Sequence, residues 1–254
     1  MAIFRSIHMA LLTLLVSGYL NAGTPDDPLE SVMWDRTRKI FLGDVDYQFD
    51  QRIRIDVPAF AEDPAQVPIR IDASVFAGNI ERMVVWADLN PIQHIFDYYP
   101  LAGGNGRVAL RIKVQQSTAV RAAVLTRDGH WHVGYAWLEA AGGGCTTPSM
   151  GNSDPYWQSH LGEIQARYFQ RPDQGTRLKL RVIHPMDTGL VSSIPEFYLE
   201  QLELRDPEDT PLVRMNLSQP VSENPVITFD LDEGTQGYSL WMRDNGGNEF
   251  IRSL

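Results

Sequence analysis

The chain has 254 residues, of which 43% are hydrophobic and 21% are charged, and it carries a formal net charge of −10. This composition is typical of a globular protein, and it excludes a polytopic membrane protein, a disordered chain and a collagen-like rod. The excess of acidic residues argues against nucleic acid as a partner, because phosphate contacts need a basic surface. A single cysteine, Cys145, excludes an internal disulfide and a zinc site built from several cysteines.

Residues 1–22 have the pattern of a secretory signal peptide. Arg5 precedes an apolar run from Met9 to Leu20, and Ala22 suits the last position before a cleavage site at Gly23. The apolar run is shorter than the roughly 20 residues that a membrane-spanning helix needs, so we expect export without membrane insertion. With a bacterial source as the working assumption, the sequence predicts a periplasmic protein.

The following residues predict one helix and then a long series of strands. Acidic residues open the segment from Asp26 to Phe41 and basic residues close it before Gly43, which is the order that a helix dipole favours. The hydrophobic period then changes to two, and turn residues such as Asp128-Gly129 separate short alternating runs. These runs are Arg52 to Val57, Ile69 to Asp72, Val108 to Val114, His130 to Leu138, Glu163 to Tyr168, Arg177 to Ile183, Phe197 to Leu204, Leu212 to Leu217, Val226 to Leu231 and Tyr238 to Met242. The pattern predicts an all-β fold of the β-sandwich type, with Trp131 and Trp137 in its core.

The alternation breaks at residues 140–158, which are dense in Gly, Ser, Thr, Asn and Pro and have no period. Such a segment is typical of a linker. We therefore predict a first domain at residues 23–140, a flexible linker at residues 141–158 and a second domain at residues 159–254.

Cys145 lies in this linker, directly after Gly142-Gly143-Gly144. A structural cysteine normally packs at an apolar position of a strand or helix, whereas this one has no predicted element, and three glycines free the backbone before it. We expect an exposed thiol, and an exported, unpaired thiol suggests that the sulfur itself is used. No Arg, Lys or His adjoins Cys145 in sequence, which favours a handle for cargo over an activated nucleophile. A tolerated linker cysteine and an intermolecular disulfide are the alternatives.

Two segments resemble a known pair of families. The stretch from Asn90-Pro91-Ile92 to Gly142-Gly143-Gly144-Cys145 resembles the SoxY sulfur carrier, which ends in a glycine-rich arm with one cysteine. The run Val182-Ile183-His184-Pro185-Met186-Asp187-Thr188-Gly189, with the later Glu223-Asn224-Pro225, resembles its partner SoxZ. The chain is similar to a fused SoxYZ-like carrier of the type associated with quinoprotein dehydrogenases. It departs from SoxY in that Thr146-Thr147-Pro148 follow the cysteine, so the arm is a loop tethered at both ends.

The resemblance implies two immunoglobulin-like β-sandwich domains that pair within one chain, with a short helix before the first. It implies that Cys145 is the covalent attachment site for sulfur intermediates and that Gly142, Gly143 and Gly144 form the swinging arm. The protein would then be a carrier and no enzyme, with no catalytic residue and no cofactor. Its partners would be periplasmic sulfur-oxidation enzymes or c-type cytochromes, or a quinoprotein dehydrogenase system. For His184 the resemblance implies a structural or interface role.

Two other functions stay open at this point. His130 and His132 share a strand face and could hold a metal with Cys145 or Met150, as in a periplasmic copper chaperone. Alternatively, the chain could be an immunoglobulin-like interaction module of a dehydrogenase system, with the cysteine incidental.

Overall fold

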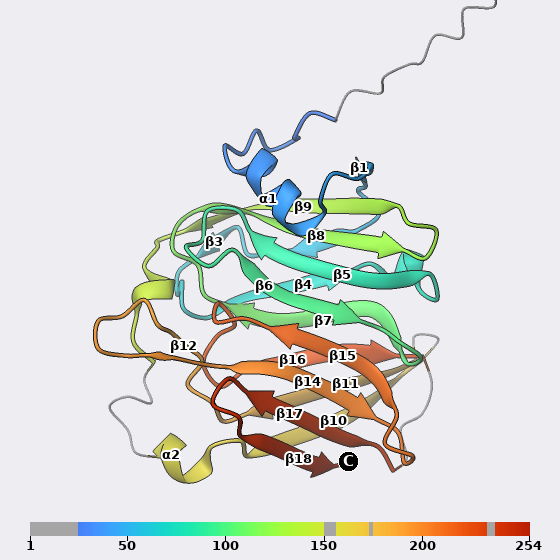
Figure 1. Ribbon diagram of the computed structural model, residues 1–254, viewed down its shortest axis with the longest axis vertical. Coiled ribbons are helices and arrows are strands. Elements are labelled where there is room, and N and C mark those ends of the chain that lie inside the picture. Colours follow the sequence, from blue (N-terminus) through green and yellow to red (C-terminus); the bar gives the residue numbers. More distant parts are fainter. Residues whose placement is uncertain (1–24, 150–155, 173–174, 233–236) are drawn as a thin grey trace, which may run out of the picture.

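The computed structural model describes residues 25–149, 156–172, 175–232 and 237–254, which fold mainly into β-strands (Figure 1). The predicted signal peptide and Met150 lie outside these ranges. No helix in the described ranges is long and apolar enough to cross a membrane. The first half contains α1 (Trp34–Phe41), β1 (Tyr47–Phe49), β2 (Arg54–Asp56), β3 (Phe60–Ala61), β4 (Val67–Asp72), η1 (Ser74–Phe76), β5 (Ile80–Ala87), β6 (His94–Tyr99), β7 (Gly104–Ile112), β8 (Thr118–Thr126), β9 (Trp131–Ala140) and η2 (Gly144–Thr146). The second half contains α2 (Tyr156–His160), β10 (Ile164–Arg171), β11 (Gly175–Val182), β12 (Asp187–Thr188), β13 (Glu196–Phe197), β14 (Leu199–Arg205), β15 (Pro211–Leu217), β16 (Val226–Leu231), β17 (Ser239–Asp244) and β18 (Glu249–Ser253).

Two large sheets run without a break from the first half of the chain into the second. One has the order β1-β9-β8-β5-β6-β15-β14-β17-β18, with β3 also paired to β9, and the other has the order β10-β11-β16-β7-β4-β2. The halves join where β6 pairs with β15 in the first sheet and where β7 pairs with β16 in the second. Figure 1 shows the first half above the second, with the joining strands between them.

One hydrophobic core lies between these sheets and takes side chains from both halves. Phe96 and Tyr98 of β6 and Ile112 of β7 belong to the same buried cluster as Met215 of β15 and Phe229 of β16. The all-β prediction with immunoglobulin-like sandwich domains is confirmed. The two sandwiches are not separate bodies on a linker, however, because strand pairing fuses them edge to edge.

The predicted alternating runs correspond to β2, β4, β7, β9 and to most strands of the second half. The bounds of the central strands β5, β6 and β8 were not predicted, because most of their residues are buried on both faces and do not alternate. In β5, Met83 and Val85 enter the core between the sheets, whereas Val84 and Trp86 pack on the opposite face beneath α1. A strand covered on both faces has no polar side to reveal its period.

The N-terminal helix is shorter than predicted: α1 covers Trp34–Phe41, and the residues before it form turns. The Asp27 carboxylate accepts hydrogen bonds from the N–H groups of Leu29, at 3.3 Å, and Ser31, at 2.7 Å. Glu30 adopts a left-handed φ of 50°. Side-chain oxygens that bind nearby N–H groups compete with helix formation, so the acidic start of this segment forms a turn.

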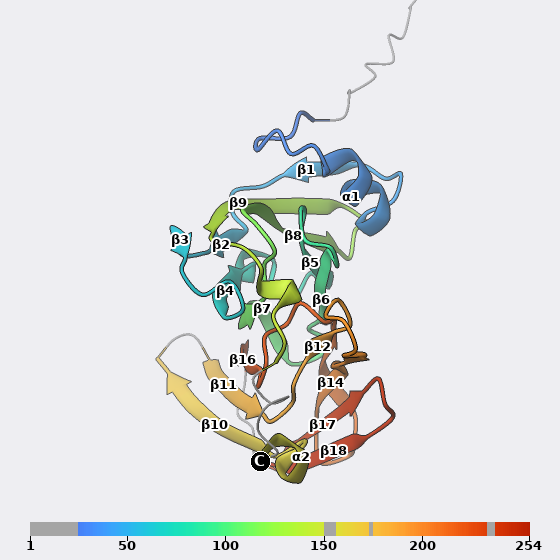
Figure 2. The same cartoon turned by 90° about the vertical axis from the view of Figure 1, so that its left-hand side faces the viewer.

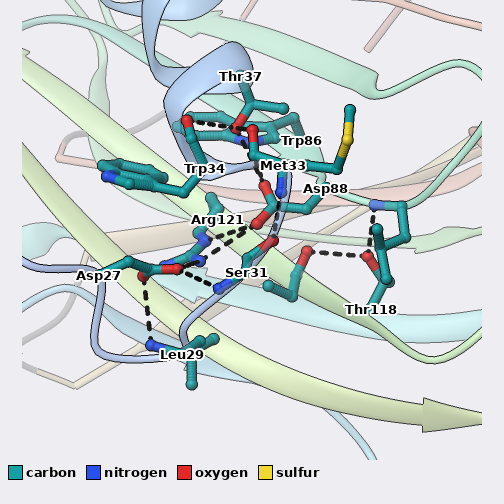
Figure 3. Close-up of polar contacts among 12 residues, drawn as sticks. Asp27, Leu29, Ser31, Met33, Trp34, Thr37, Trp86, Asp88, Thr118 and Arg121 are labelled. Carbon is teal, nitrogen blue, oxygen red and sulfur yellow. Dashed lines mark hydrogen bonds and ion pairs between the residues drawn. The ribbon is translucent and has the colours of Figure 1, made fainter.

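A buried ion network fastens this N-terminal turn to the sheet (Figure 3). Arg121 of β8 donates both terminal nitrogens to Asp27, each at 2.7 Å, and also contacts Asp88 at 3.2 Å. Asp88 further accepts from the Trp86 indole at 2.8 Å and the Thr37 hydroxyl at 3.3 Å. Each carboxylate therefore has several donors, as a buried charge requires.

The expectation that Trp131 and Trp137 belong to the sandwich core is wrong for Trp137, whereas Trp131 is buried, but in a second, smaller core cluster. Both lie on the outer face of β9, where Trp131 packs with Trp34 in the smaller cluster under α1. Trp137, further along the strand, is 43% exposed. The helix covers only the first part of β9, which accounts for the difference.

Candidate functional site

The glycine arm lies against the end of β7, where the two halves of the chain meet. The N–H of Gly143 donates to the carbonyl of Gln115 and the N–H of Gly144 to that of Val114, both at 2.9 Å. Residues Gly144–Thr146 then form the single turn η2. Figures 1 and 2 show this turn, in yellow-green, at the level of the junction between the halves.

Two of the arm glycines are required by their close approach to backbone. A Cβ on Gly144 would collide with the carbonyl oxygen of Pro64, and one on Gly142 would lie 2.8 Å from the oxygen of Gln115. Gly142 and Gly143 also adopt left-handed φ values of 94° and 88°, although a Cβ on Gly143 would meet open space. Gly142 and Gly144 therefore let the backbone fit where a side chain would collide, and Gly143 supplies a left-handed φ.

Cys145 is buried rather than exposed, contrary to the sequence-based expectation. Its side chain is 1% exposed, and its Sγ lies 3.6 Å from the carbonyl oxygen of Lys113. The same carbonyl accepts a hydrogen bond of 2.9 Å from the Asn90 amide. The glycines that were expected to expose the thiol instead allow it to be buried at the junction between the two halves, which we call the seam.

The second half supplies a cradle for the arm from the run that resembles SoxZ. Thr188 donates its hydroxyl to the carbonyl of Cys145 at 2.7 Å. The Lys113 ammonium donates to the carbonyl of Met186, a residue with a left-handed φ of 52°. Cys145, Lys113 and the 186–188 segment thus form one buried cluster across the junction, which we call the arm site.

Burial controls the protonation of the thiol. Desolvation raises the pKa of Cys145 to about 11, and the charge of Lys113 opposes this shift without cancelling it. Burial lowers the pKa of Lys113 from its ordinary value, against the charges of Asp187, Cys145 and Glu223. The docked thiol is therefore protonated near neutral pH and is a poor nucleophile.

Lys113 is a site residue that sequence reasoning missed. No cation adjoins Cys145 in sequence, but Lys113, which is 32 residues away along the chain, lies close to the thiol in the folded protein. Lys113 follows the last residue of β7 and is 3% exposed. It stands at a position where the alternation of the strand predicts an outward side chain, so the pattern held no signal for its burial.

His184 is buried beside the arm site. Its Nδ1 accepts from the N–H of Met186 at 3.2 Å, so the proton of the neutral ring is on Nε2, which faces Asp244 at 3.6 Å. Burial lowers the pKa of His184 to about 4, although Asp244 acts in the opposite direction. The ring also packs on Phe197 with 4.5 Å between centroids. His184 is thus neutral near pH 7 and holds the Met186 turn in shape.

The structure does not bring His130 and His132 to Cys145. Both histidines lie at the start of β9 and the arm follows its end, so the full strand separates them, roughly 30 Å. His132 bonds to Asp50 and Gln48, each at 2.9 Å, and His130 is exposed. In the described ranges, no group of three His, Cys, Asp or Glu residues could hold a metal ion. The hypothesis of a joint metal site with Cys145 is wrong, and Met150 lies outside the described residues.

Comparisons with known proteins assign a family to each half. Residues 38–145 match the family "Sulfur oxidation protein SoxY", and residues 165–254 match "Sulphur oxidation protein SoxZ". No curated protein matches the chain. Among solved structures, the sulfur carrier protein SoxY from Chlorobium limicola f thiosulfatophilum is similar, with 19% identity and a TM-score of 0.38 over 42% of this chain and 90% of that one.

The two family matches divide the chain at the arm. The SoxY match ends on Cys145, and the SoxZ match begins at residue 165, after the linker and α2. The SoxZ match includes all of residues 184–189, the segment that contains Met186 and Thr188 and forms the cradle for the arm. The chain therefore carries a domain of the SoxY family followed by a domain of the SoxZ family in a single polypeptide.

Proposed function

We propose that this protein is a periplasmic sulfur carrier with no catalytic activity of its own, in which Cys145 holds a sulfur intermediate while partner enzymes act on it. One observation carries the proposal: the only cysteine of the chain lies on a glycine arm in the seam between a SoxY and a SoxZ domain. Cargo attachment is the role that such a thiol suits, because burial raises its pKa and the nearby charge of Lys113 does not cancel that shift.

The arm works by alternating between the docked state described above and an extended state. A thiol with 1% exposure cannot enter a partner's active site, so the arm has to leave the seam before loading or processing. In the described ranges, the polar contacts that tie residues 143–146 to the rest of the protein are few and weak: two backbone hydrogen bonds from Gly143 and Gly144, one from the Thr188 hydroxyl, and two longer contacts, from Cys145 Sγ to the Lys113 carbonyl and from the Thr146 hydroxyl to Gln115. Each contributes about 1 kcal/mol, so the docked arm can open without unfolding the domains.

Thiosulfate is the donor class that fits a sulfur-oxidation carrier. Loading forms one S–S bond between Cys145 Sγ and the sulfane sulfur of thiosulfate. It releases the thiol proton and passes two electrons to an external oxidant, for which a c-type cytochrome is the suitable class. The product is a cysteine S-thiosulfonate. The proposed partners are sulfur-oxidation enzymes and c-type cytochromes that load and process this thiosulfonate. A quinoprotein dehydrogenase system is the alternative partner that the sequence resemblance suggests.

The double tether limits how partners receive the arm. Thr146 and Thr147 follow the cysteine and hydrogen-bond to the carbonyl of Gly143, at 3.2 Å and 2.9 Å. A partner must therefore accept a bent loop rather than a free chain end. Fusion in turn keeps the SoxZ cradle at high effective concentration near the SoxY arm.

Intact-mass measurement tests the proposal. The full chain is incubated with thiosulfate and an oxidising c-type cytochrome, and we expect a mass increase equal to one whole thiosulfate group less the thiol hydrogen, which a reductant removes. Cys145→Ser should gain nothing. Lack of any Cys145-dependent adduct with thiosulfate, sulfide or polysulfide donors would contradict the carrier function.

A further inference from the structure

Basic side chains gather on the outer face of the six-stranded sheet, although the chain as a whole is acidic. Alternation places them there: in β11, Leu178 and Leu180 are buried in the core, whereas Lys179 and Arg181 point to the other side and are exposed. The same alternation holds in β10, β7 and β4. The basic residues of this face are Arg54, Arg70, Arg107, Arg111, Arg167, Arg171, Arg177, Lys179 and Arg181, and the acidic residues among them are Asp56, Asp72 and Asp230.

The acidic residues neutralise only one end of this face. Asp230 bonds to Arg171 and Arg177, both at 2.6 Å, and Asp72 bonds to Arg107 at 3.1 Å. By contrast, Arg111, Arg167, Lys179 and Arg181 make no ion pair with any residue in the described ranges. Positive charge therefore remains uncompensated on β10, on β11 and at the end of β7.

These four cations surround a shallow trough that crosses the junction of the two domains. Its floor has small side chains, since Thr228 of β16 pairs with Ala109 of β7, and Val226 continues the row. Two adjoining open cavities of about 410 and 360 Å³ share Arg111, Lys179 and Val226 in their linings. We call this surface the basic trough.

The basic trough ends beside the arm site. β7 and β11 are both antiparallel to β16, so they run in the same direction and their C-terminal ends lie at the same end of the sheet. Arg111 stands two residues before Lys113, whose carbonyl meets the thiol, and Arg181 stands just before the 184–189 cradle. In Figure 2, β11, β16 and β7 belong to the sheet at the left, and the arm turn, in yellow-green, lies between this sheet and the other one.

We propose that the basic trough is a docking surface for a partner protein that presents acidic side chains and then receives the Cys145 arm; only the second half of this statement rests on the proposed function. The unpaired cations are spread over three strands and do not converge on one point, which suits an extended protein surface better than a small anion. The net charge of the chain disfavours nucleic acid. Charge complementarity at this edge would steer the partner so that its active site faces the arm.

The first test uses a fluorescein-labelled peptide of glutamate residues as the acidic probe, followed by fluorescence anisotropy at low salt. The trough variant carries Arg111→Gln, Lys179→Gln and Arg181→Gln. The control variant carries Arg36→Gln, Lys39→Gln and Arg127→Gln, which removes the same charge from exposed residues on α1 and the β8–β9 turn. We expect the trough variant to bind about tenfold more weakly than the wild type, and the control to change less than about threefold.

The outcomes separate the possible ligands. Equal losses in both variants, or no loss in the trough variant, would overturn the proposal. Displacement of the peptide by inorganic phosphate at matched ionic strength, with one phosphate per chain, would identify a small-anion site and overturn it as well. Cys145→Ser should bind the probe like the wild type, because docking does not need the thiol.

The second test measures enzymatic loading of Cys145 against carrier concentration, with the oxidising cytochrome as the partner. The trough variant should raise the KM for the carrier about tenfold and leave kcat unchanged, whereas the control variant should keep both. Loading of the trough variant with unchanged KM would contradict the docking surface. A wild type that never loads would instead contradict the carrier function, so the two failures are distinguishable.

Discussion

Gly144 illustrates how one residue controls the state of the arm. Its Cα faces the carbonyls of Pro64 and Val114, and the site holds the arm only because no side chain stands there. Gly143 has the same kind of left-handed φ as Gly142 but meets open space. The neighbouring glycines therefore offer a steric variant and a matched control within one segment.

Gly144→Ala should release the arm without unfolding the domains. The new methyl group would collide with Pro64, so we expect the thiol of the native protein to react with a disulfide reagent about tenfold or more faster than in the wild type. Gly143→Ala adds backbone strain of about 1 kcal/mol but no collision, so its rate should rise less. Equal rates in wild type and Gly144→Ala, with both folded by circular dichroism, would contradict a thiol that is protected by docking.

The reactivity of the thiol should also depend on pH in a way that reports docking. Burial raises the pKa of Cys145 from 9.0 to about 11, so the docked state is fully favoured below pH 9 and loses stability as pH rises toward 11. The wild-type rate should follow an apparent pKa well above 9.0, and Gly144→Ala one close to 9.0. Stopped-flow measurements between pH 7 and pH 11 check this, and coincident profiles would contradict it.

At the scale of single residues, the sequence identified Cys145 but misjudged its surroundings. The glycines before it are compatible with an extended arm and equally with a tight fit against Pro64, and only the tertiary structure decides between them. Lys113 and Thr188 reach the thiol segment from distant parts of the chain. Contacts of such long range leave no local pattern that could be recognised from spacing.

Among the elements, the N-terminal turn and α1 are joined to the sheet by Arg121, which is fully buried between Asp27 and Asp88 and lies 4.9 Å from the Trp34 ring. The sequence predicted a helix here from the order of charges. It could not predict that Asp27 would pair across the sheet instead of opening the helix, because Arg121 lies 94 residues away. β5 was missed because α1 covers its outer face, and β6 because its residues from Ile95 to Tyr98 are all buried.

Arg121→Met should destabilise the fold more than Asp27→Asn. The first leaves Asp88 buried without its cation and should lower the free energy of unfolding by about 3–5 kcal/mol, and the second by about 1–3 kcal/mol. Asp35→Asn, on an exposed carboxylate of α1, should cost less than about 0.5 kcal/mol. Urea unfolding measures all three. The reaction rate of the Cys145 thiol should stay at its wild-type value. The arm lies against the end of β7 in the six-stranded sheet, whereas Arg121 lies on the outer face of the larger sheet.

The Asp27 contribution should vanish in acid. Burial alone would raise the pKa of Asp27, but the hydrogen bonds and charge of Arg121, with the N–H groups of Ser31 and Leu29, hold it below 3.8. Its stabilisation is therefore present above pH 4 and is lost as pH falls through the lowered pKa. The stability gap between wild type and Asp27→Asn should shrink below pH 4. A gap independent of pH would contradict the assigned ion pair.

For the whole molecule, two shared sheets and one core predict that the SoxY and SoxZ domains unfold as a single cooperative unit. Leu202→Ala, on β14 in the core of the SoxZ domain, should cost about 2–5 kcal/mol and lower the melting temperature by roughly 8 °C. Amide groups in β14 and in β5 of the SoxY domain should lose the same amount of protection from hydrogen exchange. Val85→Ala on β5 should likewise lower protection in both domains. Two calorimetric transitions, or a loss confined to the mutated half, would contradict the shared core. The sequence pattern indicated two separate sandwiches because alternation shows which face of a strand is buried, but not which strand pairs with it. The pairing of β6 with β15 and of β7 with β16 joins the two domains, so the arm site lies inside one folded body.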